Sequence, residues 1–442
     1  MRRNKEAGQV LFTTAAALVV LIGIAGLAVD VGVLRYEKRV QQSAADAAAI
    51  AGAEEIPVSG SLILAGQAAS AQNGFADSGT GQVSTCTASG AAVGTICVQV
   101  DNPPQTGPHA SCSSPCNYVE ALVSKVHPTY FMKIFGRDTA TVTARAVATM
   151  VSNAGGTNGC VYTLGPQGTG IGVTNSGTPQ VTAPTCAIYD DGDWTTHGKP
   201  VNIQAGAIGI VGTDTNNGGG TVNPTLVTVA PATDPLSYLT PPCTSCSGGS
   251  ALNISSNTVV SPGTYSSISI TGGTVNFQPG TYIITGNFTV NGNATVCSST
   301  NNNCSGMSSN PPTSVNAGVT FYMTGGGGVT MNGTANVYLS APTSGSYTGI
   351  LFYQDPSDCS AATLNGTNTS FYQGALYFPG DPNAGCNVQL NFGGTLTNTS
   401  AAYTVIVTDD LKFFGTSNVT INSNYSSLPG GVFPAKNAVL VE

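Results

Sequence analysis

The 442-residue sequence has few charged side chains, because Lys, Arg, Asp and Glu make up only 8% of it, against about 25% in an average soluble domain. Basic residues are rarest in the second part: residues 151–442 contain three lysines, and no arginine follows Arg145. This part alone carries the net charge of −8. Binding to phosphates needs a basic face, so the composition excludes nucleic acid as a partner.

Catalytic motifs are also scarce. The histidines His109, His127 and His197 are scattered and lie beside no serine or cysteine motif, so no catalytic triad is indicated. The glycine-rich runs lack the lysine and the strand-to-helix context of a phosphate-binding loop. We therefore expect a protein that is not an enzyme, with no catalytic residues, no cofactor and no metal.

A membrane-tethered, polysaccharide-active β-helix enzyme is the competing hypothesis. Glycosidases use two carboxylates about 5–10 Å apart, and the candidates are Asp190, Asp191 and Asp193 in YDDGDW with Asp409 and Asp410 in VTDDLKFF. Adjacent aspartates on a strand point to opposite faces, so we interpret all five as turn residues. A calcium site at DDGDW is a further alternative. A lyase would instead need basic residues, and the second part offers only Lys199, Lys412 and Lys436.

A long apolar run stands near the start of the sequence. Residues 10–29 contain no charge, and twenty helical residues at about 1.5 Å each span roughly 30 Å, the thickness of a hydrocarbon core. We predict a retained transmembrane helix, with residues 1–9 as a cytoplasmic tail. The alternatives are a cleaved secretory signal, whose apolar part reaches about 15 residues, and a secreted adhesin released by cleavage near Ala53.

Twelve cysteines follow the apolar run, and they fall into pairs of neighbours in the sequence. The pairs are Cys86/Cys97, Cys112/Cys116, Cys160/Cys186, Cys243/Cys246, Cys297/Cys304 and Cys359/Cys386. Their even number predicts disulfides in an oxidising compartment, which places the long C-terminal part outside the cytoplasm. One alternative is a zinc site built from the pairs Cys112/Cys116 and Cys243/Cys246. Another is a reactive dithiol at CTSC.

The helical pattern continues beyond Val29. Its small and apolar residues fall close to one helical stripe, Val33, Val40, Ala44, Ala47, Ala48 and Ala51. Asp30 then lies at the outer membrane interface, where we interpret it as a solvated residue marking the membrane edge. Contact with a partner is the alternative. Pro57 ends the helical region.

Residues 61–150 predict a small α/β unit. We expect a short Ala-rich helix over 61–72, strands around 83–86 and 95–100, and a loop over 101–116. Residues 118–150 predict a strand, a short helix over 130–135 that stops at Gly136, and a second strand over 139–148.

Four stretches of this N-terminal part together resemble a known family. They are GQ before the apolar run, AGLAVDVGVL at its end, VQQSAADAAAIAGA after it, and VHPTYFMKIFG with VTARAVA, all within residues 5–150. The combination is similar to the N-terminal region of tight-adherence (Tad/Flp) pilus-assembly proteins of the TadG-like type. The resemblance implies a single-pass protein of the bacterial inner membrane, associated with machinery that assembles or anchors adhesive pili. Its partners would be pilus-assembly proteins, and we expect assembly contacts at Asp30, Tyr36 and Glu37.

Two features of that family are missing. Pseudopilins of the system carry a glutamate five residues after a cleaved glycine, and after Gly8 this position is Thr13, so processing does not carry over. Many TadG-like proteins also bear a von Willebrand A-type domain with an Asp-x-Ser-x-Ser metal site, and the sequence has no such string.

The second part predicts many short strands. Apolar residues alternate over three to five residues, as in Phe288/Val290 and Val405/Val407, between turns rich in Gly and Asn. This pattern indicates strands with one buried face.

Weak internal repeats favour a parallel β-solenoid over a β-sandwich. PGTY occurs at Pro262 and Pro279, and NGNATV at Asn291 is echoed by NGTANV at Asn332. We expect on the order of ten coils of roughly 20–30 residues, with Asn and Thr ladders along the stack.

The chain is thus predicted to be mainly β, with a transmembrane helix over 10–29, a helix and small α/β stalk over 30–150, and a parallel β-helix (solenoid) over 151–442. We expect a membrane-anchored, non-enzymatic component of a pilus-assembly or adhesion system. Its solenoid would be periplasmic or otherwise extracytoplasmic and would contact pilus components, the envelope or a surface glycan.

Overall fold

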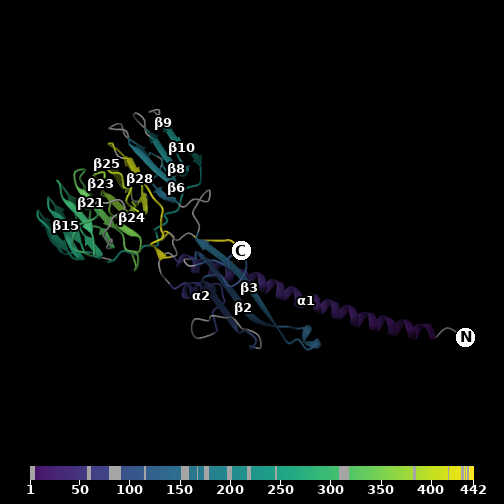
Figure 1. Cartoon of the computed structure of the whole chain (residues 1–442). Coiled ribbons are helices and arrows are strands. Elements are labelled where there is room, and N and C mark those ends of the chain that lie inside the picture. Colours follow the sequence, from purple (N-terminus) through teal and green to yellow (C-terminus); the bar gives the residue numbers. More distant parts are fainter. Residues whose placement is uncertain are drawn as a thin grey trace. The chain divides into compact units, whose positions relative to one another are not determined.

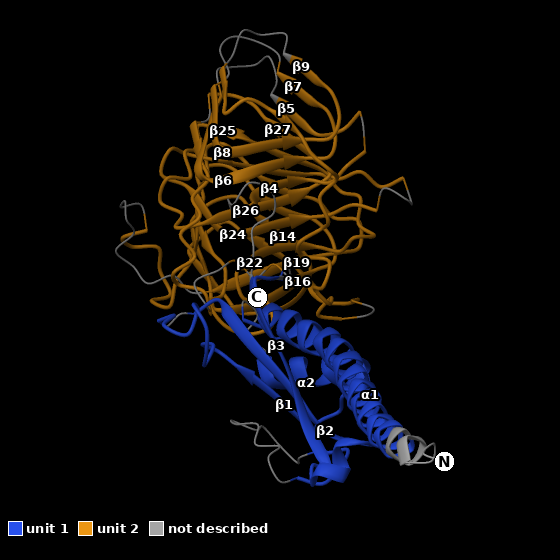
Figure 2. Ribbon diagram, turned by 90° about the vertical axis from the view of Figure 1, so that its right-hand side faces the viewer, with its two compact units in different colours: residues 1–56, 60–150, 438–442 blue, residues 57–59, 151–437 orange. Residues whose placement is uncertain are grey.

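The computed structural model describes residues 5–56, 61–78, 91–113, 116–150, 159–166, 168–173, 179–196, 202–216, 221–243, 246–307, 318–381, 385–416, 418–429, 433, 435 and 438–442 (Figure 1). The chain forms two compact units (Figure 2). Residues 1–56, 60–150 and 438–442 make the first, and residues 57–59 and 151–437 make the second.

The first unit is built on one long helix, α1 (Lys5–Glu54). Residues 11–54 of α1 are long and apolar enough to cross a membrane, and only 11% of the most apolar window is buried within the protein. The large side chains of this stretch, such as Leu11 and Phe12, are exposed. No helix-breaking residue interrupts the passage from the apolar half to the Ala-rich half, which is why the two halves are continuous.

A short helix and an antiparallel sheet complete this unit. The helix α2 (Leu62–Gln72) begins at Ser61, whose hydroxyl accepts a bond from the Leu64 backbone nitrogen, a typical N-cap. The sheet has the order β1-β2-β3-β29, with bounds β1 (Ile96–Asp101), β2 (Tyr118–Pro128), β3 (Thr139–Met150) and β29 (Ala438–Leu440). A 3-10 turn, η1 (Met132–Phe135), joins β2 to β3 and ends at Gly136, whose φ is 74°. The predicted elements over 61–72, 95–100 and 118–150 are therefore present, whereas the strand expected over 83–86 lies outside the described residues.

The helices pack on the sheet through very small side chains. Strands β2 and β3 contact α1, and β1 contacts α2. At the crossing of the two helices a Cβ on Gly66 would lie 2.9 Å from the Ala48 carbonyl oxygen. Only glycine allows this close approach.

The last strand corrects the expected boundary of the second unit. Residues 438–442 belong to the first unit, not to a solenoid running from 151 to 442. Strand β29 pairs antiparallel with β3, with Ala438 opposite Met150. An unpaired β3 edge would expose backbone donors and acceptors, and β29 covers that edge. The second unit is therefore inserted in the chain between two paired strands of one sheet.

The second unit is a stack of short parallel strands, as the repeats predict. Its strands are β4 (Gly159–Thr163), β5 (Ile171–Val173), β6 (Gln180–Asp190), β7 (Trp194–Thr196), β8 (Asn202–Ile210), β9 (Asp214–Asn216), β10 (Thr221–Asn223), β11 (Val227–Thr228), β12 (Ser250–Ile254), β13 (Thr258–Val260), β14 (Gly263–Ile270), β15 (Thr274–Phe277), β16 (Gly280–Ile284), β17 (Phe288–Val290), β18 (Thr295–Ser298), β19 (Val319–Met323), β20 (Val329–Met331), β21 (Asn336–Ser340), β22 (Ile350–Gln354), β23 (Ala362–Gly366), β24 (Phe371–Phe378), β25 (Gln389–Gly394), β26 (Thr404–Thr408), β27 (Asp410–Phe413) and β28 (Asn418–Thr420). Equivalent residues of stacked coils are 18 apart at one place, Ile210 to Thr228, and 39 apart at another, Gly280 to Val319. The coils are therefore less regular than the expected 20–30 residues.

Inward-facing side chains stack in register through the solenoid. One ladder pairs residues of successive coils in the order Tyr282, Phe321, Phe352, Leu376, Ile406, Val161, Ile188 and Ile208. All of them are buried. This continuous apolar core replaces ion pairs as the main source of stability.

The coils do not stack in the order of the chain. Strand β4, the first of the solenoid, pairs with β26 on one side and β6 on the other. The chain therefore enters in the middle of the stack and builds one half outward, through β6 and β8 to β11. It then restarts at β12, the other end, and returns coil by coil to β26.

A strap, residues 229–243, connects the two halves along the outside of one sheet. The outward-facing residues of that sheet form a second ladder, Ile283, Tyr322, Tyr353, Tyr377, Val407, Tyr162, Tyr189 and Gly209. Leu236 of the strap is fully buried among these tyrosines. Strands of this sheet are thus buried on both faces, so the expectation of one buried face is wrong here. Val405 and Val407 belong to the outer cluster and Ile406 to the inner core.

The weak sequence repeats lie at stacked corners. The Asn332 amide donates to Asn291, and the Thr334 hydroxyl donates to the Gly292 carbonyl at 2.8 Å. The expected polar ladder is therefore present at this corner, where side-chain amides bond without charge.

Candidate functional site

The candidate site is the place where α1 leaves its apolar stretch and meets the sheet. Asp30 is 1% exposed. Its carboxylate accepts backbone N–H bonds from Tyr130 at 3.0 Å, Phe131 at 2.9 Å and Met132 at 2.6 Å. These N–H groups begin the turn η1, which has no side-chain cap of its own, so Asp30 supplies the cap from 100 residues away. The interpretation of Asp30 as a solvated residue is wrong, because its carboxylate is used inside the chain.

The turn η1 also packs against α1 at Gly26, four residues before Asp30. A Cβ on Gly26 would lie 2.5 Å from Cδ1 of the Phe131 ring. Glycine at this position therefore lets the Phe131 side chain approach the helix backbone closely. Gly26 and Asp30 together hold the β2–β3 turn at the end of the apolar stretch.

Further along, α1 faces the sheet with polar as well as small residues. The Gln41 amide donates to the carbonyls of Val123 at 3.2 Å and Val142 at 3.0 Å, and its oxygen lies 3.2 Å from Nε2 of His127. The other ring nitrogen of His127 lies 3.9 Å from the Glu37 carboxylate. Burial lowers the pKa of His127, and nearby Lys125 acts in the same direction, while Glu37 opposes them. This imidazole is therefore mostly neutral at pH 7.

The buried face of α1 is rotated from the predicted stripe. Ala44 and Ala48 are buried as expected, whereas Val33 and Val40 are only half-buried. The fully buried positions include Asp30 and Gln41, which an apolarity pattern passes over. Among the three expected assembly contacts, Glu37 turns toward His127 and only Tyr36 is exposed, at 65%.

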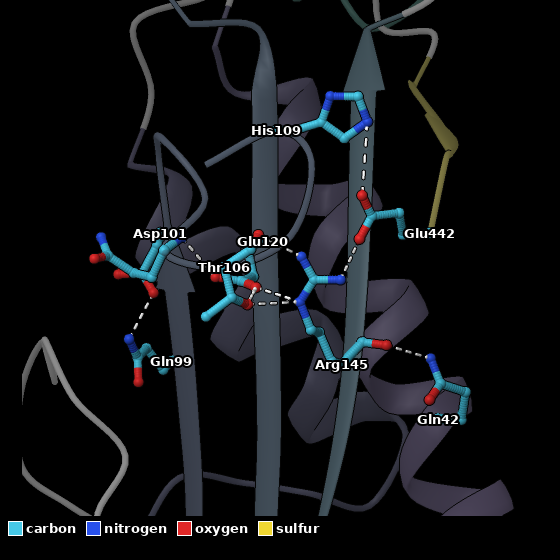
Figure 3. A network of polar contacts seen from close by, with 9 residues as sticks. Gln42, Gln99, Asp101, Thr106, His109, Glu120, Arg145 and Glu442 are labelled. Atoms are coloured by element: carbon cyan, nitrogen blue, oxygen red, sulfur yellow. Dashed lines mark hydrogen bonds and ion pairs between the residues drawn. The ribbon is translucent and has the colours of Figure 1, made fainter. Parts of the chain in front are cut away.

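A polar cluster ties the returning strand to the sheet (Figure 3). Arg145 on β3 donates from Nε to the Glu120 carboxylate and from Nη1 to that of Glu442. Glu120 on β2 is fully buried, and it also accepts from the Thr106 hydroxyl at 2.6 Å and the Gln105 backbone nitrogen at 2.7 Å. Burial alone would raise the pKa of Glu120, but the bonds from Thr106, Arg145 and Gln105 and the charge of Arg145 outweigh it and lower the pKa.

His109 completes the rim of this cluster. Its Nε2 lies 3.7 Å from the Glu442 carboxylate, and its ring stacks on Tyr118 at 4.0 Å between centroids. Of the histidines that the structure describes, His109 lies in the loop between β1 and β2, and His127 lies near the end of β2. His197 lies outside the described residues. The cluster fastens the two strands that enclose the inserted unit, because Glu442 follows β29.

The aspartates of YDDGDW point to separate partners. Asp190 is buried and accepts from the Thr163 hydroxyl at 2.7 Å and the Ile171 nitrogen at 3.1 Å. Asp191 accepts from the strap at Ala232 at 2.9 Å, and Asp193 accepts from Thr213 at 2.7 Å. Asp191 and Asp193 lie in the bend that follows β6, in line with the interpretation as turn residues. Asp190 is instead the last residue of β6. Within the described residues, no three His, Cys, Asp or Glu side chains form a metal-binding group.

Asp409 and Asp410 likewise diverge. Asp409 is buried and accepts from the Val388 nitrogen at 2.8 Å, and burial raises its pKa to about 6. Asp410 forms an ion pair with Lys412 at 3.1 Å on the surface. Of the remaining lysines weighed for a lyase, Lys199 and Lys436 lie outside the described residues.

Ten of the cysteines form disulfides between neighbours in the sequence, as predicted. Disulfides link Cys112 to Cys116, Cys160 to Cys186, Cys243 to Cys246, Cys297 to Cys304 and Cys359 to Cys386. Cys97 is also disulfide-bonded, while Cys86 lies outside the described residues. Cys112 is bonded to Cys116, and Cys243 is bonded to Cys246. These four sulfurs therefore offer neither a zinc site nor a free dithiol in this structure.

The sequence did not predict three features. Two lie in the first unit, the Asp30 cap and the Glu120–Arg145–Glu442 cluster, and the third is the strap of the solenoid. The first two join residues that are far apart in the chain, and no local pattern marks them. The strap had a signal, because PATDPLSYLTPPC has proline without apolar alternation inside a β region.

Comparison with protein families now adds to this geometry. Residues 8–55 match the Flp pilus-assembly TadE/G-like family, and residues 42–148 match the Tad-like Flp pilus-assembly family. No curated protein and no solved structure matches the chain. The two family matches cover α1, α2 and β1 to β3, and they stop where the inserted solenoid begins. Residues 8–148 of this chain are therefore similar to Flp pilus-assembly domains, TadE/G-like over residues 8–55 and Tad-like over residues 42–148, and they are joined to a parallel β-solenoid.

Proposed function

We propose that the protein is a non-enzymatic, membrane-anchored component of a Tad/Flp-type pilus system. In this proposal α1 spans the inner membrane once, and the sheet and the solenoid lie on the periplasmic side. The solenoid provides an extended surface that contacts pilus components, the envelope or a surface ligand.

The observation that carries the proposal is the division of α1 into two halves. One half is uncovered, with Leu11 and Phe12 73% and 76% exposed. The other half packs on a sheet that belongs to the pilus-assembly match. Apolar surface of this extent needs a non-aqueous environment, and a bilayer supplies it. The disulfides support a periplasmic side for both units.

A positioning role is also supported by the covered face of the solenoid. The tyrosine ladder is occupied along its outer side by the strap, where Tyr353 donates to the Leu239 carbonyl at 3.1 Å and Tyr377 donates to Asp234 at 2.7 Å. Four of the aspartates weighed for catalysis, Asp190, Asp191, Asp193 and Asp409, accept bonds from backbone N–H groups. The fifth, Asp410, pairs with Lys412. Tyr36 is the assembly contact that remains exposed on α1.

The membrane part is tested by fractionation and topology. We expect the full chain in the membrane pellet after alkaline carbonate washing, and a periplasm-specific thiol-blocking reagent, added after reduction, should modify the solenoid cysteines in intact spheroplasts. A chain recovered in the soluble fraction contradicts the proposal. For the pilus role, Tyr36→Ala should lower pilus number while the chain stays at parent level, with exposed Arg39→Ala as the matched control.

The non-enzymatic part is tested on glycans. Purified full chain should release no reducing ends from acidic or neutral polysaccharides. Activity that disappears in Asp410→Asn, a substitution at the surface, would favour the tethered enzyme instead.

A further inference from the structure

The β2–β3 turn presents a cluster of uncovered apolar side chains. Tyr130, Ile134 and Phe135 are 63%, 79% and 74% exposed. All three lie in or beside η1, the turn that Asp30 and Gly26 hold. A soluble surface rarely gathers large apolar residues in one short turn, so this tip, residues 130–137, needs a covering.

The contacts of the tip fix its level along α1. Phe131 packs on Gly26, which lies within the stretch 10–29, and three N–H groups of the tip bond to Asp30, the residue that follows it. Gly26 is about 6 Å along the helix from Asp30. The tip therefore lies beside the last turn of the apolar stretch, and Figure 1 shows α1 continuing alone from there toward its N-terminus.

Basic residues surround the tip. Lys133 and Arg137 belong to it, and neither forms an ion pair with an acidic side chain of the described residues. On α1, one to two turns beyond Asp30, Arg35 and Lys38 line a shallow groove of about 310 Å³ between the helix and β3. Aromatic rings with adjacent Lys and Arg form the usual pattern of a segment at the membrane–water interface.

We propose that the tip is a second membrane contact, in which Tyr130, Ile134 and Phe135 enter the interfacial layer of the bilayer that α1 spans. Lys133 and Arg137 then extend toward the phosphates of anionic lipids. The contact restrains rotation and tilt of α1, because a single helix can turn freely in a bilayer whereas a helix with a bonded side arm cannot. The inference rests on the proposed placement of α1 across the membrane.

The test places a fluorescent probe at the tip of the full chain in vesicles of phosphatidylethanolamine and phosphatidylglycerol. Ile134→Trp adds a tryptophan to the parent, whose only one is Trp194 in the solenoid core. We expect the added emission to fall about twofold when lipids brominated near the headgroup replace ordinary lipids, because interfacial segments reach the first acyl carbons. Leu440→Trp is the matched control, since β29 pairs with β3 at Ala148, nine residues and about 30 Å from the start of β3. It should lose no emission.

Two further variants separate the possible failures. Leu18→Trp lies within the apolar stretch and should be quenched by lipids brominated deep in the chains; no quenching there refutes the placement of α1 itself. Quenching of Leu18→Trp with none at Ile134→Trp refutes the tip contact alone. Protection of the tip tryptophan from aqueous iodide without quenching by bromolipid assigns the tip to a protein partner and also overturns the proposal. Quenching of Ile134→Trp should be stronger in vesicles with phosphatidylglycerol than in vesicles of neutral lipid alone. Adding both Lys133→Gln and Arg137→Gln to this variant should reduce that difference.

Discussion

Removing the guanidinium of Arg145 tests whether the polar cluster holds the sheet together. In Arg145→Leu, the buried carboxylate of Glu120 keeps its bonds from the Thr106 hydroxyl and the Gln105 nitrogen, but it loses its cation. Glu442 loses its ion pair at the same time. The variant therefore contains a buried charge without a counter-charge near the start of β2.

The magnitude follows from that buried charge. Breaking a buried ion pair from one side costs about 3–5 kcal/mol. Glu120 keeps two hydrogen bonds, and the Arg145 side chain is 27% exposed. We therefore expect a loss of unfolding free energy at the low end of this range, about 3 kcal/mol. The more exposed pair with Glu442 adds less than about 1 kcal/mol.

The pH dependence should also change in a defined direction. The parent holds the pKa of Glu120 below its ordinary value, so this residue stabilises the parent above the unfolded pKa and the benefit is lost as the pH falls. Without Arg145 burial still raises the pKa of Glu120 while two of the opposing interactions are lost, so we expect this pKa to lie above the unfolded value. The variant should then lose stability as the pH increases, and it should be closest to the parent in acid.

Hydrogen exchange of β2 and β3 amides, measured by mass spectrometry on the full chain in detergent, reports the opening free energy of this unit. Arg39→Leu is the control, because Arg39 is exposed on α1; its effect should stay within about 0.5 kcal/mol. The double variant Arg145→Leu with Glu120→Leu should be more stable than Arg145→Leu alone. The reasoning is refuted if Arg145→Leu exchanges like the control, or if the double variant is the least stable of the set.

Three further predictions concern the solenoid, whose unfolding Trp194 fluorescence can follow in urea. Burial raises the pKa of Asp409 to about 6, so the folded unit binds this proton more tightly and its unfolding free energy should fall by about 2.4 kcal/mol from pH 4 to pH 7 through this residue; Asp409→Asn should reduce that slope, and an unchanged slope contradicts the assignment. Alanine at both cysteines of the Cys160–Cys186 disulfide, which spans 26 residues, should cost about 3.5 kcal/mol, against about 1.5 kcal/mol for Cys243–Cys246, which spans 3; equal costs would contradict the loop-length argument. Tyr377→Phe leaves half-buried Asp234 without its hydroxyl donor and should loosen the strap by about 1 kcal/mol, seen as faster proteolysis within residues 229–243 at unchanged Trp194 fluorescence.

Local patterns in the sequence determined much of the architecture. The uncharged run of residues 10–29, the Ala-rich stretch over 61–72, the stop at Gly136 and the short alternating segments each depend on neighbours within a few residues. These signals predicted α1, α2, the β2–η1–β3 hairpin and a parallel solenoid, all of which the structure contains. The stretches that resembled a pilus-assembly region coincide with the family matches.

Only the tertiary structure decided which distant segments meet. Asp30 caps a turn 100 residues away, Glu442 pairs with Arg145 across the whole inserted unit, and β4 stacks on β26 rather than starting an end of the solenoid. A carboxylate or a short strand carries no local mark of its partner, because its bonding energy depends on burial and on groups brought near by the folding of other segments. The sequence by itself therefore determined the elements and their class, whereas the order of the coils, the outer strap and the roles of the polar residues came from long-range packing.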